Sequence, residues 1–218
     1  MPKILSAHDA VRQYIHDGDT VTFGGFASGL MHPESILRAL EERARNGEGP
    51  HGLTALYAAG QGDSDSRGLN HLGVEGLCRR VIGGHWGLSP KLGRLCAENK
   101  LAGYNLPQGV IAQLFRDIAA GKPGVITHVG LGTFVDPRLE GGKLNDAARA
   151  AGDVVKLIEL EGEEKLFYPA IPIQVAILRA SYADTRGNCT FQREGVYAEA
   201  LAQAQAARNS GGTVIVQV

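Results

Sequence analysis

The sequence predicts an α/β fold in which helices cover both faces of an open, largely parallel sheet. Short apolar runs alternate with segments whose apolar residues recur at helical spacing, a pattern typical of a parallel sheet with connecting helices. The 30 glycines are neither periodic nor gathered at one end, which indicates many tight turns between strands and helices. A chain of 218 residues is long enough to bury a sizeable core around such a sheet.

The elements of the first half follow one another clearly. Ser6, with Asp9 three residues later, is typical of a capping box at the start of a helix that runs to about Ile15. A strand is predicted over Thr20–Phe23, and Pro33 opens the next helix. The remaining elements of this half are expected in the order strand 53–58, strand 81–82, helix 90–99, strand 101–104, helix 110–119 and strand 125–129.

The pattern changes near residue 154. Strands over 154–160, 165–168 and Val175–Arg179 are expected in closer succession, before a helix over 197–208 and a final strand over 213–218. The chain stops on the apolar run of this last strand, whose composition is typical of a core strand. We therefore expect this chain to be one half of a larger catalytic unit.

Composition and charge narrow the class of protein. The hydrophobic fraction of 44%, the charged fraction of 21% and the net charge of −1 give no reason to expect a nucleic-acid or membrane-surface partner. No apolar run approaches the length of a membrane span, and the first residues lack the apolar region of a signal peptide. The three widely spaced cysteines favour buried reduced thiols over disulfides or a zinc site, so we expect a cytoplasmic protein.

Glycine-rich loops follow several of the predicted strands. Ligands of open α/β folds bind at the carboxyl ends of the strands, which is where these loops fall. The two most distinctive stretches cover residues 104–110 and 129–145, and both combine glycine, proline and amide side chains. Such loops hold special backbone shapes and offer hydrogen bonds, so they indicate a binding or catalytic site.

Gln108, within Pro107-Gln108-Gly109, is the strongest candidate for chemistry. Proline fixes the backbone before the glutamine, and glycine frees it afterwards. A preorganised amide donor can stabilise the oxyanion of an acyl transfer, which is typically worth about 10²–10³ in rate. From the spacing alone, an equally good alternative is that Gln108 merely caps the helix that starts near Val110.

Five motifs, in order along the chain, resemble those of the family I coenzyme A transferases, and most of all the single-chain acetate or propionate CoA-transferases. The motifs are GGF at 24–26, GGHWGLSP at 83–90, YNLPQG at 104–109, GLGTFVDPR at 130–138 and GGKLN at 141–145. The resemblance implies the α/β fold of that family. It also implies that residues 1–218 form a single α-type domain, and that the β-type catalytic half lies outside this chain.

The resemblance further implies a reaction. Coenzyme A would move between a short-chain acyl-CoA and a carboxylate such as acetate, propionate or butyrate, by covalent ping-pong catalysis. A glutamate of the β-type half would form a mixed anhydride and then a glutamyl-CoA thioester. Coenzyme A is then a substrate, and neither a metal nor a redox cofactor is implied. The expected assembly is an αβ unit that associates into a higher oligomer.

The matched motifs also suggest residue roles. Gln108 would be an oxyanion-hole donor, and Leu30 and Met31 are further candidates to line the acyl pocket. The substrate-binding residues would be Gly24, Gly25, Phe26, Gly109, Gly132, Thr133 and Phe134.

Other polar and aromatic residues receive structural interpretations. Asp136 and Arg138 are expected to form an ion pair that supports their loop, and Trp86 is expected to pack. Glu98 lies in a stretch that resembles the glutamate box of β-type halves, but it falls at a predicted helix end and Lys100 replaces a glycine, so we do not assign it as the nucleophile. The Asp63-Ser64-Asp65 run lacks further ligands at suitable spacing and is expected to be a solvated loop.

Two alternative functions stay open. An acyl-CoA hydrolase could use the same fold, with water intercepting the glutamyl intermediate, and dependence on an added carboxylate would separate the two reactions. The other alternative is a non-catalytic ligand-binding or regulatory domain, since related folds serve sugar-phosphate isomerases and effector-sensing domains. A fold by itself does not define a function.

Overall fold

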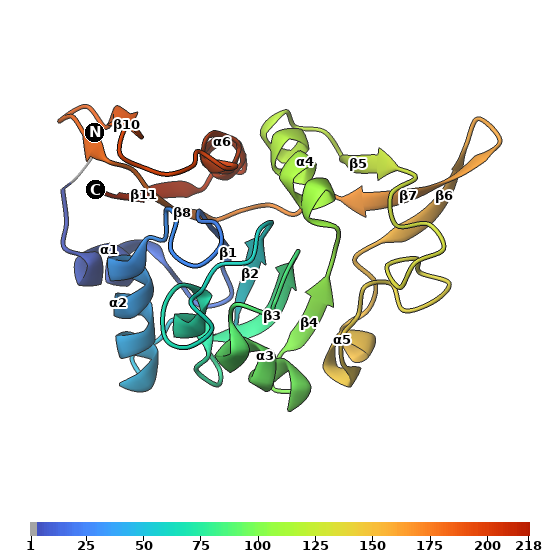
Figure 1. Cartoon of the computed structure of the whole chain (residues 1–218), viewed down its shortest axis with the longest axis horizontal. Helices are drawn as coiled ribbons and strands as arrows, with labels where there is room; N and C mark the ends of the chain where they lie inside the picture. Colours follow the sequence, from blue (N-terminus) through green and yellow to red (C-terminus); the bar gives the residue numbers. More distant parts are fainter. Residues whose placement is uncertain (1–3) are drawn as a thin grey trace.

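The computed structural model describes residues 4–218, and its main feature is a six-stranded parallel sheet (Figure 1). The sequence-based expectation that the first residues do not form a signal peptide includes Met1-Pro2-Lys3, and these three residues lie outside the part of the chain that the structure describes. The strands in their order across the sheet are β11 (Thr213–Gln217), β8 (Val175–Arg179), β1 (Thr20–Phe23), β2 (Leu53–Tyr57), β3 (Cys78–Gly83) and β4 (Ala102–Asn105).

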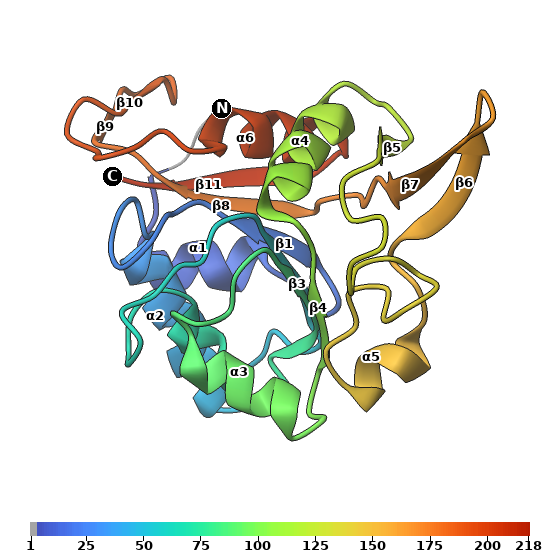
Figure 2. The same cartoon turned by 45° about the vertical axis from the view of Figure 1, so that its right-hand side comes forward.

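Helices cover both faces of this sheet, which confirms the predicted fold class. Three helices pack on one face, and two others lie side by side on the opposite face (Figure 2). Neighbouring residues of a strand enter different cores: Val81 packs with the first group, and Ile82 packs with the second. The first group is α1 (Ala7–Tyr14), α2 (Glu34–Arg45) and α3 (Pro90–Ala97), and the second is α4 (Gln108–Ala119) and α6 (Ala200–Asn209).

A second, antiparallel sheet extends beside α4. It has the order β5-β7-β6, with β5 at Gly124–Thr127, β7 at Glu163–Pro169 and β6 at Lys156–Leu160. The sequence predicts a strand over 125–129, and the structure places it in this sheet and not beside β4. Residues 142–145 already cover the outer edge of β4, through hydrogen bonds from Asn105 N–H to the Gly142 carbonyl and from Leu144 N–H to the Gly103 carbonyl.

All the predicted helices and strands are present, with ends shifted by a few residues. Several short elements were not predicted: α5 (Asp146–Ala151), the 3₁₀ helix η1 (Leu69–Leu72) and the paired strands β9 (Tyr182–Ala183) and β10 (Cys189–Thr190). The short predicted strand 81–82 is longer, because Arg79 and Arg80 belong to β3 despite their charge. Within residues 4–218, no helix has the length and apolar character to cross a membrane.

Candidate active site

The carboxyl ends of the parallel strands meet at one edge of the sheet, and the predicted loops follow β1, β3 and β4 there. β1 lies between β2 and β8, so the strand order reverses beside it, and ligands of such sheets bind at this switch point. The Gly24-Gly25-Phe26 loop leaves β1 at this position. Neighbouring strands lie about 4.8 Å apart, so the ends of β1 and β4 lie about 14 Å apart, across the loops after β2 and β3.

The loop after β1 folds back on itself. Phe26 and Leu30 exchange backbone hydrogen bonds of 2.8 and 3.1 Å, and their side chains are 39% and 40% exposed. Ala27 and Met31 have φ angles of 52° and 58°. This left-handed backbone conformation is unfavourable for residues that have a side chain, and residues that adopt it are enriched at functional sites. Met31 is 1% exposed and packs in the core, so it does not form part of an exposed pocket wall.

Buried polar side chains lie directly beneath Gly25. Its φ angle is +148°, and a Cβ atom there would lie 2.6 Å from Gln61 Oε1 and 2.8 Å from His32 Cδ2. Only glycine therefore fits between these two side chains. Burial lowers the pKa of His32 below its usual range, so the imidazole is neutral at pH 7.

Gln108 begins α4 and leaves its side chain free. Pro107 occupies the N-cap position, no side chain caps the helix, and the exposed Gln108 amide makes no hydrogen bond within residues 4–218. The alternative in which Gln108 caps the helix is therefore not realised. The first N–H groups of a helix lack carbonyl partners and carry the positive end of its dipole. The free amide and these N–H groups can together donate hydrogen bonds to an oxyanion.

The loop after β3 fixes the position of Gln108. A Cβ atom on Gly84 would lie 2.2 Å from the Ala58 carbonyl oxygen and 2.9 Å from the Cα and Cβ atoms of Gln108. The backbone of this loop therefore packs directly against Gln108, and a side chain at position 84 would displace Gln108. Trp86 packs against the core, in agreement with the sequence interpretation, whereas His85 is exposed at this edge.

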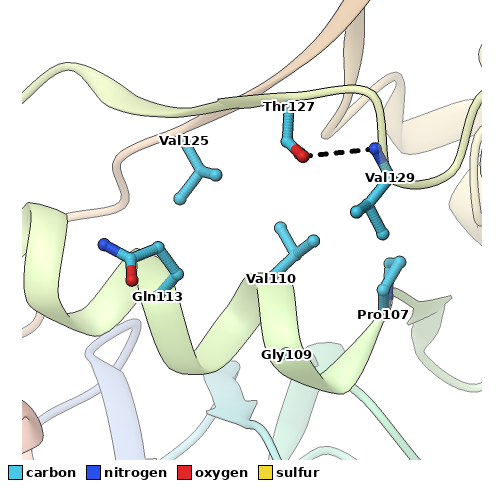
Figure 3. A pocket seen from close by; sticks show the side chains of 7 residues that line it. All are labelled: Pro107, Gly109, Val110, Gln113, Val125, Thr127 and Val129. Atoms are coloured by element: carbon cyan, nitrogen blue, oxygen red, sulfur yellow. Dashed lines mark hydrogen bonds between the residues drawn. The ribbon is translucent and has the colours of Figure 1, made fainter.

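An apolar groove of about 230 Å³ runs along α4 from Pro107 to Gln113 (Figure 3). Val125, Thr127 and Val129 form its opposite wall, where the Thr127 hydroxyl accepts a hydrogen bond of 3.2 Å from the Val129 N–H. Gly109 lines the groove as a backbone surface and directly follows Gln108 in the chain, but the Gln108 side chain itself does not line the groove. The first turn of α4 therefore carries both the free Gln108 amide and one end of an apolar groove.

The loop that contains Gly132, Thr133 and Phe134 is held by the predicted ion pair. The Arg138 guanidinium donates two hydrogen bonds to the buried Asp136 carboxylate, at 3.0 and 2.8 Å, and two more to Glu164 on β7. The Gly132 N–H donates to the same aspartate, and these hydrogen bonds hold the pKa of Asp136 well below its usual range. The ion pair thus anchors the loop to the second sheet.

The structure brings some of the predicted site residues together but separates others. Gly109 lines the groove and follows Gln108 in the chain. The carbonyl of the exposed Phe134 accepts a hydrogen bond from the Gly142 N–H, and the Gly142 carbonyl accepts one from Asn105 at the end of β4. Gly132, Thr133 and Phe134 do not line the groove. Its actual wall comes from the residues just before them, which sequence reasoning missed. The alternate spacing of Val125, Thr127 and Val129 in a predicted strand is the signal that could have identified a shared face.

Glu98 and Asp63 have no part in this arrangement. Glu98 follows α3 and precedes β4, so it lies at the amino ends of the strands, at the opposite edge of the sheet from Gln108. The Asp63 carboxylate accepts backbone hydrogen bonds from Asp65, Ser66 and Arg67 and shapes its own loop. The described residues contain no group of histidine, cysteine and acidic side chains that could hold a metal ion.

Comparison with known proteins places this chain in a family. The family model described as "Coenzyme A transferase" matches residues 4–218, and the chain therefore belongs to the coenzyme A transferase family. The acetate CoA-transferase YdiF of Escherichia coli O157:H7 is 41% identical over 99% of the chain. The crystal structure of the YdiF apoenzyme superposes with a TM-score of 0.94 over 100% of this chain and 43% of that one.

Two further relatives differ in how much of their length the chain matches. The caffeate CoA-transferase of Acetobacterium woodii is 47% identical over 100% of the chain, which spans 41% of that protein. The chain likewise spans only 40% of YdiF. The acetate CoA-transferase subunit alpha of Escherichia coli K12 is 31% identical over 87% of the chain, which spans 75% of that subunit. The chain therefore corresponds to about two fifths of the longer relatives and to most of the separate subunit.

Proposed function

We propose that this chain is the α-type half of a coenzyme A transferase that moves CoA between a short-chain acyl-CoA and a carboxylate such as acetate, propionate or butyrate. The observation that carries the proposal is the free Gln108 amide at the start of α4, the helix that forms one wall of an apolar groove. Membership of the CoA-transferase family supports the reaction class. Relatives named for acetate and for caffeate support carboxylate-dependent transfer but leave the preferred acyl group to experiment.

In the proposed reaction, a glutamate of the β-type half attacks the thioester carbonyl, the C–S bond breaks, and CoA leaves as a thiolate, so that a mixed anhydride of the glutamate and the acyl group forms. The thiolate then attacks the glutamyl carbonyl, releases the first carboxylate and leaves a glutamyl-CoA thioester. The second carboxylate reverses both steps. Each addition passes through a tetrahedral oxyanion, and Gln108 donates a hydrogen bond to it. The covalent chemistry needs no electron transfer, and CoA is a substrate rather than a cofactor.

The groove along α4 is the proposed binding place of the acyl chain. Its volume of about 230 Å³ lies below the usual range for drug-sized ligands, and its walls are mainly apolar. A short acyl chain fits this size and polarity. Gly24, Gly25, Phe26 and Gly109 are proposed to contact the acyl-CoA, and Gly132, Thr133 and Phe134 to close the site from the other side.

The proposed partner is a β-type half, either fused to this chain or present as a separate subunit. Relatives of both kinds support it, since the chain spans about two fifths of YdiF and 75% of an alpha subunit. Residues 1–218 would then form one α-type domain in an αβ unit that associates further. We propose a cytoplasmic location, with no nucleic-acid or membrane partner.

The proposal is tested by a transferase assay that follows propionyl-CoA formed from acetyl-CoA and propionate. Activity is expected only when this chain is combined with its β-type half. The Gln108→Ala variant should lower kcat by about 10²–10³-fold, because one preorganised oxyanion donor is lost. Gln205→Ala, the same change at an exposed position of α6, is the matched control and should leave kcat unchanged.

The alternatives give different results in the same assay. Release of free CoA at an undiminished rate without any carboxylate would establish the hydrolase instead. If the complete two-half protein bound acyl-CoA without turnover, the result would favour the non-catalytic regulatory function over the transferase. Activity of this chain without the β-type half would contradict the placement of the nucleophilic glutamate.

A further inference from the structure

Two buried glutamines from distant parts of the chain donate to one carbonyl oxygen. Gln61 Nε2, in the loop after β2, lies 2.9 Å from the Phe23 carbonyl oxygen, and Gln203 Nε2, on α6, lies 3.1 Å from the same atom. Gln203 Nε2 also lies 2.9 Å from the Thr22 hydroxyl. Both glutamines are only 2% exposed. Phe23 ends β1, and its carbonyl belongs to the peptide that enters the Gly24-Gly25-Phe26 loop.

The switch point explains why this carbonyl needs side-chain partners. The β1–β2 pairing ends at Thr22 and Leu56, so Phe23 lies beyond the last paired residue on that side. On the other side, the Gly24 N–H donates to the Ile177 carbonyl of β8 at 2.8 Å. Both polar ends of the Phe23–Gly24 peptide are therefore fixed, by groups from β8, α6 and the loop after β2. A buried peptide group must find such partners wherever a strand ladder ends.

The two glutamines also shape the space around the glycines. Gln61 Oε1 would lie 2.6 Å from a Cβ atom on Gly25, and Gln203 Oε1 would lie 3.6 Å from one on Gly24. Neither amide oxygen has a hydrogen-bond partner in the part of the chain that the structure describes. An apolar side chain of similar length would fill the same volume without burying an unpaired oxygen. Packing alone therefore does not account for glutamine at either position.

We propose that Gln61 and Gln203 are positioning residues that jointly fix the Phe23–Gly24 peptide, and with it the loop that contacts the acyl-CoA. This inference rests on the proposed function. Each amide acts through the shared carbonyl and touches no substrate itself. Rotation of this peptide would move the Gly25 backbone and the Phe26 ring, and a displacement of about 1 Å in a site of this kind costs about 10²-fold in rate.

The shared acceptor predicts a specific kinetic pattern for methionine variants in the complete two-half enzyme. Gln61→Met and Gln203→Met each leave one amide on the Phe23 carbonyl, so each should lower kcat only about 3-fold. The double variant releases the carbonyl and should lower kcat and kcat/KM together by about 10²-fold, more than the product of the single effects. Gln205→Met, on the exposed side of the same helix, is the control and should match the wild type.

Circular dichroism and the melting temperature separate positioning from folding. A double variant with wild-type kcat and an unchanged fold would overturn the inference, as would losses that merely follow the folded fraction. If the double variant does not fold, the single variants decide: lower kcat with an unchanged melting temperature supports positioning, and a lower melting temperature with unchanged kcat refutes it. An inactive wild-type two-half enzyme would refute the proposed function instead, so the two failures are distinguishable.

Discussion

Gly84 has no room for a side chain where it contacts Gln108. A Cβ atom there would lie 2.2 Å from the Ala58 carbonyl oxygen and 2.9 Å from Gln108 Cβ. We expect Gly84→Ala to lower kcat by about 10²-fold by moving Gln108, and to lower the free energy of unfolding by about 1–3 kcal/mol through overpacking. Enzyme assays and urea unfolding measure the two effects.

Gly93 provides the matched control for that substitution. It lies in α3, and a Cβ atom there would meet nothing within 4 Å. Gly93→Ala should therefore keep full activity and raise the free energy of unfolding by about 0.5–1 kcal/mol, since alanine is the better helix former. Equal activity of both variants would show that Gln108 does not depend on the loop after β3.

Asp63 gives a residue-scale prediction about acid stability. The backbone N–H of Arg67, followed by those of Asp65 and Ser66, lowers the pKa of Asp63 to about 2. A depressed carboxyl pKa contributes stability that is complete above the ordinary pKa near 4 and is lost as the pH falls towards 2. Asp63→Ala should cost about 1 kcal/mol at pH 7 and clearly less at pH 2, as measured by urea unfolding across this range.

Asp65→Ala is the control for this pH dependence, because the Asp65 side chain is exposed and accepts no hydrogen bond among the described residues. It should change stability by less than about 0.5 kcal/mol at every pH. A constant difference between wild type and Asp63→Ala from pH 7 to pH 2 would contradict the role given to the Asp63 carboxylate.

At the scale of elements, Asn145 joins α5 to the sheet. Its Oδ1 accepts from the N–H groups of Gly103 and Ala148, and its Nδ2 donates to the carbonyls of Cys96 and Leu101. This buried side chain thus caps α5 and at the same time satisfies the edge of β4 and the end of α3. The hydrogen bonds of Asn145 explain how residues 142–145 are held along the outer edge of β4, where β5 does not pair.

We expect Asn145→Ala to lower the free energy of unfolding by about 2–3 kcal/mol, because buried donors and acceptors lose their partners. The neighbouring Asp146→Ala removes a side chain that is 83% exposed and should change stability by less than about 0.5 kcal/mol. Urea unfolding of both variants provides the comparison, and similar losses in the two would show that the Asn145 network does not stabilise the fold.

A second connection between elements involves His71 on η1. Its two ring nitrogens lie 2.9 Å from Glu34 Oε1 and 2.5 Å from Glu41 Oε2, both on α2. Both ring nitrogens of this buried side chain thus lie within hydrogen-bond distance of a carboxylate on α2, which links η1 to that helix. Although burial opposes it, the hydrogen bonds from His71 and Arg45 place the pKa of Glu41 below its usual range. The sequence contained no pattern that predicts this contact.

At the scale of the whole molecule, the core between the sheet and α1, α2 and α3 protects two of the three thiols from reagents. Cys78 and Cys96 are 3% and 5% exposed, and burial raises the pKa of Cys78 to about 12 and raises that of Cys96 as well. Cys189 lies in the outer paired strands and is only partly buried. An aromatic disulfide reagent should therefore modify one thiol of the native chain and three after unfolding in guanidinium.

This thiol count tests the packing of the sheet against α1, α2 and α3. Cys189→Ser should leave a native protein without a reactive thiol, whereas Cys78→Ser should keep one. Rapid reaction of two or three thiols in the native protein would contradict a closed core on this side of the sheet.

The sequence by itself determined the fold class and the order of the elements, and it singled out Gln108 as the candidate for chemistry. These features depend on local properties, namely the spacing of apolar residues and the backbone preferences of proline and glycine. The same local reasoning found the Asp136–Arg138 pair, whose partners lie two residues apart.

Only the tertiary structure decided which distant side chains meet. It moved the strand at 125–129 into a second sheet, because residues 142–145 occupy the edge of β4. It placed Gln61 and Gln203 on one carbonyl although they are far apart in the sequence, and it separated Glu98 from Gln108 by the length of a strand. Such contacts depend on strand order and packing, which local spacing does not encode.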